Sequence, residues 1–283
     1  MVEGASAPAR RHVVLAVAPN GARKTKADHP SLPTTPDELA QTAAECLERG
    51  SAMIHLHVRD RDGRHALDAE LYRTAIARIC QKVGDRLVVQ ITSEANGQYS
   101  PAQQMTVVLQ TNPEAVSLAL REFAPDEAAE QDFAAFLERL KQMRVWPQFI
   151  LYSPEEARRF GAMQKRGLIP FEAPALLYVL GRFSLLRTAA PVDLLPFLAP
   201  DMPRFPFWSA CAFGRREAAC AVAAALLGGH ARVGFENNLK LPGGEQAASN
   251  AELVGVVARA LVELGLATQS ADGLREQIAE AMR

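Results

Sequence analysis

Eight short apolar runs recur along the chain, and segments with a helical pattern of apolar residues separate them. The runs begin at His12, Ala52, Arg86, Ala115, Val145, Ala175, Phe205 and His230. Runs that are apolar throughout, rather than alternating, are typical of parallel strands covered by helices on both faces. Eight such units in a chain of 283 residues favour an α/β fold, a closed (β/α)8 TIM barrel with one extra C-terminal helix. We expect residues 1–283 to form this single barrel domain.

Helix start and stop signals support the same alternation. Thr35, Ser100 and Ser153 each precede a proline and then a helical pattern, as expected for N-cap residues. Gly50 and Gly167 follow two of these patterns, in the position where glycine commonly ends a helix. An open dinucleotide-binding sheet is the alternative fold. No G-x-G-x-x-G motif follows a predicted strand, so the barrel is favoured.

Composition argues against several functional classes. The net charge is −1 and both signs are spread along the chain, so neither a nucleic acid nor a membrane is an expected partner. The four cysteines include no C-x-x-C pair and are expected to be reduced thiols. The sequence shows no secretory signal pattern and no apolar run of membrane-spanning length. We therefore expect a soluble cytoplasmic protein.

Two histidines stand two residues apart near the end of the second apolar run, in "MIHLHVRDRDGR". Side chains alternate along a strand, so His55 and His57 are expected to share a face at the catalytic end of a barrel. Two imidazoles suit a zinc ion, which needs a third ligand, and Glu236 directly follows the eighth run. A pair of hydrogen-bonded core histidines is the alternative. The other histidines are expected at strand starts or in loops, away from the site (His12, His29, His65 and His230).

These residues lie within longer motifs that resemble the β-keto acid cleavage enzyme family. The motifs are "APNGAR", "HPSLPTTPDELA", "GSAMIHLHVRDRDGR", "VVQITS", "NPEAVSLAL", "GGHARVGFENNL" and "ASNAELV". They occur in the family's order and extend over nearly the whole chain, which makes the resemblance specific.

The resemblance implies a zinc-containing barrel that forms a homo-oligomer, a dimer or a tetramer. It implies a retro-Claisen cleavage with acyl transfer, in which a β-keto acid and acetyl-CoA become acetoacetate and a new acyl-CoA. By the same resemblance, the zinc ligands fall on His55, His57 and Glu236, the catalytic arginine on Arg232, and the hydroxyl groups that hold the substrate carboxylate on Thr92 and Ser117.

The acidic proton relay of the family is missing from this sequence. Asn237 stands where the family has an aspartate, and Gln148 and Ile150 replace glutamates of the fifth strand. Asn237 remains at a catalytic position, but an amide cannot act as a general base. Glu94 and Glu122, after the third and fourth strands, are the candidate replacements. Solvated loop charges are the alternative for both.

Basic residues replace an expected acid near the predicted site. The family member that cleaves an aminated substrate has a glutamate at the position of Arg23. Arg23 would suit an acidic or neutral substrate tail, or a CoA phosphate, unless it belongs to a merely solvated loop. Arg182 and Arg187 could also meet phosphates. Cys211 lies near the barrel mouth, but no histidine is placed to activate it as a nucleophile.

Three functions remain open at this point. The first is the zinc-dependent cleavage with acyl transfer from acetyl-CoA. The second is another enolate reaction at the same metal site, such as decarboxylation or hydrolysis without CoA. The third is a catalytically silent barrel that binds a keto acid. The missing relay keeps the third alternative open, whereas the intact set of metal ligands favours an enzyme.

Overall fold

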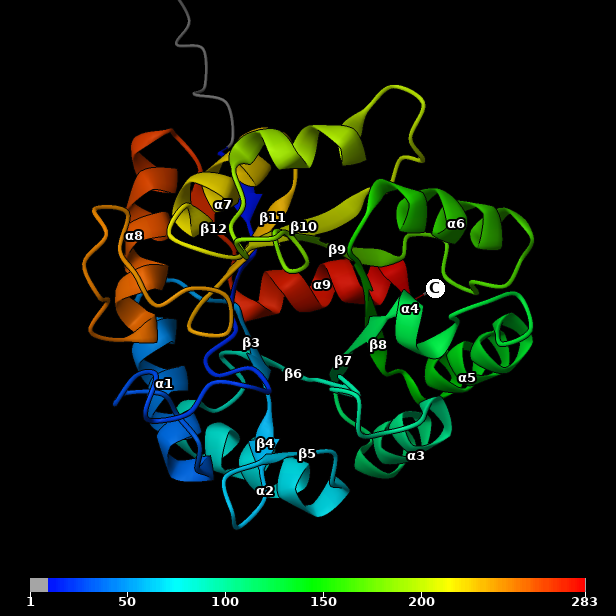
Figure 1. Cartoon of the computed structure of the whole chain (residues 1–283), viewed down its shortest axis with the longest axis horizontal. Coiled ribbons are helices and arrows are strands. Elements are labelled where there is room, and N and C mark those ends of the chain that lie inside the picture. Colours follow the sequence, from blue (N-terminus) through cyan, green and yellow to red (C-terminus); the bar gives the residue numbers. More distant parts are fainter. Residues whose placement is uncertain (1–9, 283) are drawn as a thin grey trace, which may run out of the picture.

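The computed structural model describes residues 10–282 and contains a closed barrel of eight parallel strands. Neighbouring strands follow the order β10-β11-β2-β3-β6-β7-β8-β9 around the barrel (Figure 1). The strands are β2 (Leu15–Val17), β3 (Met53–Leu56), β6 (Val88–Ile91), β7 (Ala115–Ala119), β8 (Trp146–Leu151), β9 (Ala175–Leu180), β10 (Phe207–Ala212) and β11 (His230–Val233). The predicted barrel is confirmed.

Helices surround the barrel, as the alternation of apolar runs and helical patterns predicts. They are α1 (Pro36–Glu48), α2 (Ala69–Val83), α3 (Pro101–Thr111), α4 (Leu120–Phe123), α5 (Glu130–Met143), α6 (Pro154–Lys165), the 3-10 helix η1 (Pro191–Leu198), α7 (Glu217–Leu226), α8 (Asn250–Glu263) and α9 (Ala271–Ala281). None of the helices in residues 10–282 is both long and apolar enough to cross a membrane.

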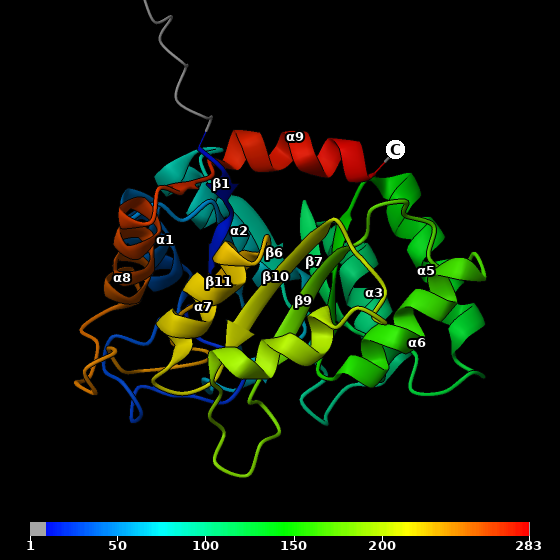
Figure 2. The same cartoon turned by 90° about the horizontal axis from the view of Figure 1, so that it is seen from above.

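The extra C-terminal helix closes one end of the barrel. Figure 2 shows α9 lying across the end from which the strands start. Ala271 and Leu274 of α9 pack against strand residues such as Met53, Val88 and Trp146. This end is therefore filled with apolar side chains, which leaves the opposite, carboxyl-terminal end for a site.

The cap residues expected from the sequence begin their helices. Thr35 accepts a hydrogen bond from the backbone N–H of Glu38, whose side chain bonds back to the Thr35 N–H. Ser100 and Ser153 accept the equivalent bonds at α3 and α6. Because these side chains satisfy otherwise unpaired N–H groups, the local sequence determines where each helix begins.

Two predicted elements differ in detail. The first apolar run divides: β1 (His12–Val13) pairs with β12 (Ala267–Thr268) in a separate two-stranded sheet, and only β2 joins the barrel. The charged stretch after β3 forms an antiparallel hairpin of β4 (Val58–Arg59) and β5 (His65–Ala66). His65, expected in a loop, therefore lies in a short strand, and its ring centroid is 5.3 Å from that of His57.

Candidate metal centre and substrate pocket

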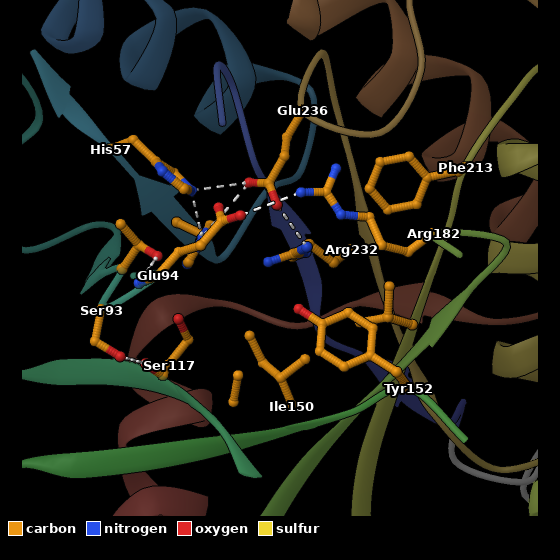
Figure 3. Close-up of a pocket in the computed structure, with 14 residues that line it drawn as sticks. His57, Ser93, Glu94, Ser117, Ile150, Tyr152, Arg182, Phe213, Arg232 and Glu236 are labelled. Carbon is orange, nitrogen blue, oxygen red and sulfur yellow. Dashed lines mark hydrogen bonds and ion pairs between the residues drawn. The ribbon is translucent and has the colours of Figure 1, made fainter. Parts of the chain in front are cut away.

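Three side chains converge at the carboxyl-terminal end of the barrel (Figure 3). His55 lies on β3, His57 follows it, and Glu236 lies in the loop after β11. Oε2 of Glu236 is 3.5 Å from Nε2 of His55 and 3.3 Å from Nε2 of His57. The two Nε2 atoms are 3.3 Å apart. The three side chains thus present their ligand-type atoms to one point.

The loop after β2 holds this arrangement in place. Asn20 accepts a hydrogen bond from the N–H of His57 and donates one to its carbonyl oxygen at 2.9 Å. Gly21 has a φ of +67°, and a Cβ at that position would lie 2.6 Å from Cγ of Glu236. A side chain at residue 21 would therefore be strained and would displace the carboxylate.

A chain of amide side chains orients His55 from inside the barrel. Nδ1 of His55 lies 2.8 Å from Oε1 of Gln90, whose amide nitrogen donates to Oε1 of Gln148 at 3.2 Å. Since a carbonyl oxygen only accepts, the bond assigns the proton to Nδ1 and leaves Nε2 with a free lone pair. Burial lowers the pKa of His55 to about 3, so the ring stays neutral. A histidine that binds a metal must be neutral, so this state suits a metal ligand.

The state of Glu236 completes a set of ligands that fits a divalent metal. Burial raises the pKa of Glu236, but Arg232 and the two histidines outweigh burial and hold that pKa well below its ordinary value. Oε1 accepts from Arg232 at 3.0 Å, whereas Oε2 is buried with no hydrogen-bond partner in the described structure. An ionised carboxylate oxygen facing two imidazole nitrogens is a donor set typical of zinc sites.

A pocket opens beside these three residues. Thr92 and Ser117 both line it. Oγ of Ser117 is buried and has no partner among the described residues, and Oγ1 of Thr92 accepts from the Glu94 N–H, which leaves the threonine proton free to donate. Nε and Nη1 of Arg232 are likewise buried without partners. These donors can receive an anionic group next to the three ligand residues.

The two candidate bases occupy different environments. Glu94 lines the pocket, and its Oε1 is 3.1 Å from the guanidinium of Arg182. Glu122 is not among the residues that line the pocket. Its Oε2 instead accepts hydrogen bonds from the Ala95 N–H at 2.9 Å and from the Gln104 amide at 2.8 Å. Burial raises the pKa of Glu122. Glu94 can therefore reach a ligand in the pocket, whereas Glu122 supports the loop that carries Glu94.

Asn237 is buried and bonded to an acid that the sequence did not single out. Its Nδ2 donates to Oε1 of Glu217 at 3.3 Å, and the N–H of Gly234 donates to the same oxygen at 2.9 Å. Nδ2 of Asn238 donates to Oε2. Burial raises the pKa of Glu217 to about 8. Glu217 follows the seventh run in the sequence, but only the packing of α7 places it beneath the "ENN" loop.

A wider groove leads outward from the pocket. Arg23 lines this groove and not the pocket, and it bonds to Asn96. Basic side chains outnumber the carboxylates of the groove (Asp28, Glu94 and Glu236); they are Arg23, Lys24, Arg182, Arg187, Arg215 and Lys240. The groove therefore suits an anionic ligand that reaches the pocket from outside.

Cys211 lies behind the pocket and is not activated. Burial raises its pKa to about 11, and Arg232 donates to its sulfur at 3.4 Å. A thiol is therefore the stable form, as the lack of a neighbouring histidine indicated.

Comparison with known proteins identifies the family. The family model described as beta-keto acid cleavage enzyme matches residues 12–279. The chain belongs to the β-keto acid cleavage enzyme family. Such enzymes are acyltransferases that cleave β-keto acids with acetyl-CoA, so the resemblance seen in the sequence motifs is confirmed.

Curated relatives of this β-keto acid cleavage enzyme family differ in substrate. The 3-keto-5-aminohexanoate cleavage enzyme of Fusobacterium nucleatum is 30% identical over 268 residues, covering 93% of this chain and 96% of that protein. The 3-oxoadipate:acetyl-CoA acetyltransferase of Cupriavidus necator is 27% identical and covers 89% of each chain. Among solved structures, ObcA bound to oxaloacetate has a TM-score of 0.69 at 16% identity, covering 88% of this chain and 67% of that one. The last match supports the barrel fold alone.

Proposed function

We propose that this protein catalyses a metal-dependent cleavage of a β-keto acid with acyl transfer to CoA. The reaction converts the keto acid and acetyl-CoA into acetoacetate and a new acyl-CoA. The observation that carries the proposal is the convergence of His55, His57 and Glu236 beside unpaired hydroxyl and guanidinium donors. The names of the relatives support the use of acetyl-CoA as co-substrate.

A zinc ion is the proposed metal, and His55, His57 and Glu236 would hold it. When bound, a divalent metal acts as a Lewis acid that polarises a carbonyl oxygen. Two neutral imidazoles and one carboxylate leave a coordination position open, which is the usual composition of a catalytic zinc site. Gln90 would keep the imidazole of His55 in the correct tautomer and orientation.

Ser117 and Thr92 are proposed to bind the substrate carboxylate, as the resemblance implies. Both hydroxyl groups have a proton free to donate, and both line the pocket beside His57. Arg232 offers two further unpaired donor nitrogens and would stabilise negative charge on the reacting group. These contacts would orient the carbon between the two carbonyl groups toward the base.

Glu94 is the proposed general base. It would take a proton from the carbon between the two carbonyl groups, and that carbon would form a bond to the acetyl carbon of the thioester. The CoA thiolate released would attack the original ketone carbon, the carbon–carbon bond would break, and the returning proton would complete acetoacetate. Glu122 is proposed to position the loop that carries Glu94.

The basic groove is the proposed binding site for the phosphates of CoA. Arg23 and Arg187 line the groove but not the pocket, consistent with a long anionic co-substrate. Arg182 lines both the groove and the pocket, and its pairing with Glu94 links the two. Asn237 lines the groove, and its amide is proposed to contact the thioester there.

The test combines metal analysis with turnover. The purified protein would be assayed for bound metal and then incubated with acetyl-CoA and a panel of β-keto acids, and acyl-CoA products would be followed by mass spectrometry. We expect about one zinc per chain and new acyl-CoA species. Loss of the keto acid without CoA would favour decarboxylation or hydrolysis. Binding of a keto acid without any turnover would favour a silent binding protein.

A pair of variants tests the assignment of the base. Glu94→Gln should lower kcat by about 10²-fold or more, as expected for removal of a general base. Glu122→Gln is the matched control and should lower it less than about tenfold, because the amide can still accept from the Ala95 N–H. Equal losses in both variants, or unchanged turnover in both, would contradict the assignment of Glu94.

A further inference from the structure

A tyrosine hydroxyl reaches the pocket from the end of β8. Side chains alternate along a strand, so Tyr152 follows Gln148 and Ile150 on the inward face. Gln148 bonds to Gln90 inside the barrel, and Ile150 and Tyr152 both line the pocket. Figure 3 shows the Tyr152 hydroxyl pointing into the pocket, with no hydrogen bond to another residue that lines it. The pocket therefore contains a phenolic donor whose proton is available to a ligand.

Neighbouring side chains hold the ring of Tyr152 in this direction. Cζ of Arg121 lies 4.3 Å from the centre of the Tyr152 ring and 4.4 Å from that of Phe183. Glu156 supports both partners: its Oε1 accepts from Arg121 at 2.7 Å, and its Oε2 accepts from the backbone N–H of Tyr152 at 2.6 Å. The hydroxyl is thus oriented before a ligand binds, which is what makes a hydrogen-bond donor effective in catalysis.

The electrostatics of the pocket keep this hydroxyl protonated. Burial and then the charge of Glu94 raise the pKa of Tyr152, and the guanidinium groups of Arg182 and Arg232 offset this rise only in part. Arg232 also lines the pocket, and its Nε and Nη1 are without partners among the described residues. A protonated phenol and a guanidinium with free N–H groups can both donate to an anionic oxygen.

We propose that Tyr152 is a further catalytic residue, whose hydroxyl donates a hydrogen bond to a negatively charged oxygen of the keto acid. The inference rests on the proposed function, which gives the acid two such groups. One is the carboxylate, which has lone pairs left for a third donor beside Ser117 and Thr92. The other is the ketone oxygen, which gains negative charge from the C–H electron pair when Glu94 takes the proton. In either case the proton of Tyr152 stays on the phenol.

Acetoacetate is the probe for this hydrogen bond, because the proposed reaction forms it from every keto acid. Its binding to the metal-loaded protein would be measured by calorimetry. The exchange of the hydrogens between its two carbonyl groups for deuterium would be followed by NMR in heavy water, relative to the rate without protein. Binding reports contacts to the carboxylate, whereas exchange reports the formation of the enolate. Neither measurement requires acyl transfer or knowledge of the natural keto acid.

Tyr152→Phe removes the hydroxyl and keeps the ring that Arg121 covers. We expect it to raise the Kd of acetoacetate or to slow the exchange by about tenfold or more, the usual effect of losing one hydrogen bond to a charged group. A raised Kd places the bond at the carboxylate, and a slower exchange at unchanged Kd places it at the enolate oxygen. Tyr178→Phe is the matched control, because Tyr178 packs against Phe197 and Trp208 and does not line the pocket.

The outcomes separate this inference from the proposed function. If Tyr152→Phe binds acetoacetate and exchanges its hydrogens as the wild type does, the inference is overturned while the proposed function stands. If the wild type itself does not catalyse the exchange, the proposed function is overturned and the inference with it. A defect in Tyr152→Phe that comes with lost metal or a lower Tm would assign the hydroxyl a structural role and also overturn the inference. A tenfold defect with normal metal content and Tm, absent from Tyr178→Phe, supports it.

Discussion

At the scale of single residues, the site depends on side chains that approach each other closely. Gly21 illustrates this, because the side chain of Glu236 occupies the space that a Cβ at residue 21 would need. Its positive φ of +67° adds a second reason for glycine. The loop motif "APNGAR" therefore supports the candidate metal centre without supplying a ligand side chain.

Gly21→Ala should reduce metal binding in a protein that still folds. The added methyl group would displace Glu236, whose Cγ lies 2.6 Å from the ideal Cβ position. Gly63→Ala is the matched control, since Gly63 has a φ of +75° with no atom within 4 Å. We expect both variants to show similar backbone strain, but only Gly21→Ala to lose bound metal by elemental analysis. Equal metal contents would contradict the role assigned to Gly21.

Gln90→Leu should weaken metal binding by about 10- to 100-fold, the usual effect of removing the partner of a ligand histidine. The substitution removes the bond between Oε1 of Gln90 and Nδ1 of His55, so the ring loses its fixed tautomer. Affinity would be measured by competition with a chromophoric chelator. Gln131→Leu places the same change on the exposed face of α5 and should leave the affinity unaltered. An unchanged affinity in Gln90→Leu would remove the support for this orienting role.

The sequence predicts some of these neighbours and not others. His55 and His57 share a face because side chains alternate along a strand, a local rule that needs no tertiary information. Glu94 and Glu122 look alike in the sequence, since both follow strand ends. Their side-chain directions depend on how the following loop folds, and only the structure shows Glu94 in the pocket and Glu122 bonded to Ala95.

At the scale of elements, a buried acid connects α7 to the loop after β11. Glu217 begins α7 and accepts hydrogen bonds from Gly234, Asn237 and Asn238. Glu236 lies within this loop, so the start of α7 helps to hold a proposed ligand. Periodicity predicts a helix after the seventh strand, but it cannot show that the first residue of the helix faces inward.

Glu217→Gln should flatten the pH dependence of stability. Burial raises the pKa of Glu217 in the folded state to about 8, whereas a glutamate in the unfolded chain has a pKa of about 4.3. Between these values the folded state keeps a proton that the unfolded state loses. The stabilisation is therefore complete below about pH 4 and is lost as the pH rises to about 8.

Urea denaturation at pH 5 and pH 8 would measure this effect. The fall in unfolding free energy between the two pH values should be larger in the wild type than in Glu217→Gln by at least about 1 kcal/mol, because one pKa unit corresponds to about 1.4 kcal/mol. Other titrating groups, including Lys24, are common to both proteins and cancel in the comparison. Parallel pH profiles would show that Glu217 is not held in its protonated form.

Local signals also explain which elements were anticipated. The starts of α1, α3 and α6 agree with prediction because a hydroxyl residue, a proline and a helical pattern occur together at each. The first apolar run is continuous in sequence, yet its first residues pair with β12 outside the barrel. That division depends on where the chain between α8 and α9 passes, which no local pattern encodes.

At the scale of the whole molecule, the barrel is closed at one end and open at the other. α9 covers the amino-terminal end with apolar contacts, and the carboxyl-terminal end holds the candidate metal centre and both cavities. The loop after β9 exposes Phe183, Leu185 and Leu186 near that end. The homo-oligomer implied by the family resemblance stays a prediction, and this loop is a surface that such an assembly could cover.

Removal of metal should lower the stability of the whole barrel, because His55, His57 and Glu236 come together only when β3 and the loop after β11 are folded. A ligand that binds only the folded state stabilises it by about 2.7 kcal/mol when its free concentration is 100 times Kd. For a chain of this size, about 1 kcal/mol corresponds to about 2–4 °C in Tm. We therefore expect a chelator to lower Tm by about 5–10 °C and added zinc to restore it.

His57→Ala is the control that assigns this effect to the proposed site. Without one of its three ligands the site should bind metal weakly, so the Tm of the variant should be low from the start and insensitive to chelator. Zinc bound elsewhere, for example at exposed acids, would stabilise the wild type and the variant equally. A Tm that falls with chelator in both proteins would place the stabilising metal outside His55, His57 and Glu236. A Tm that changes in neither would mean that the barrel does not rely on a metal to connect β3 to the loop after β11.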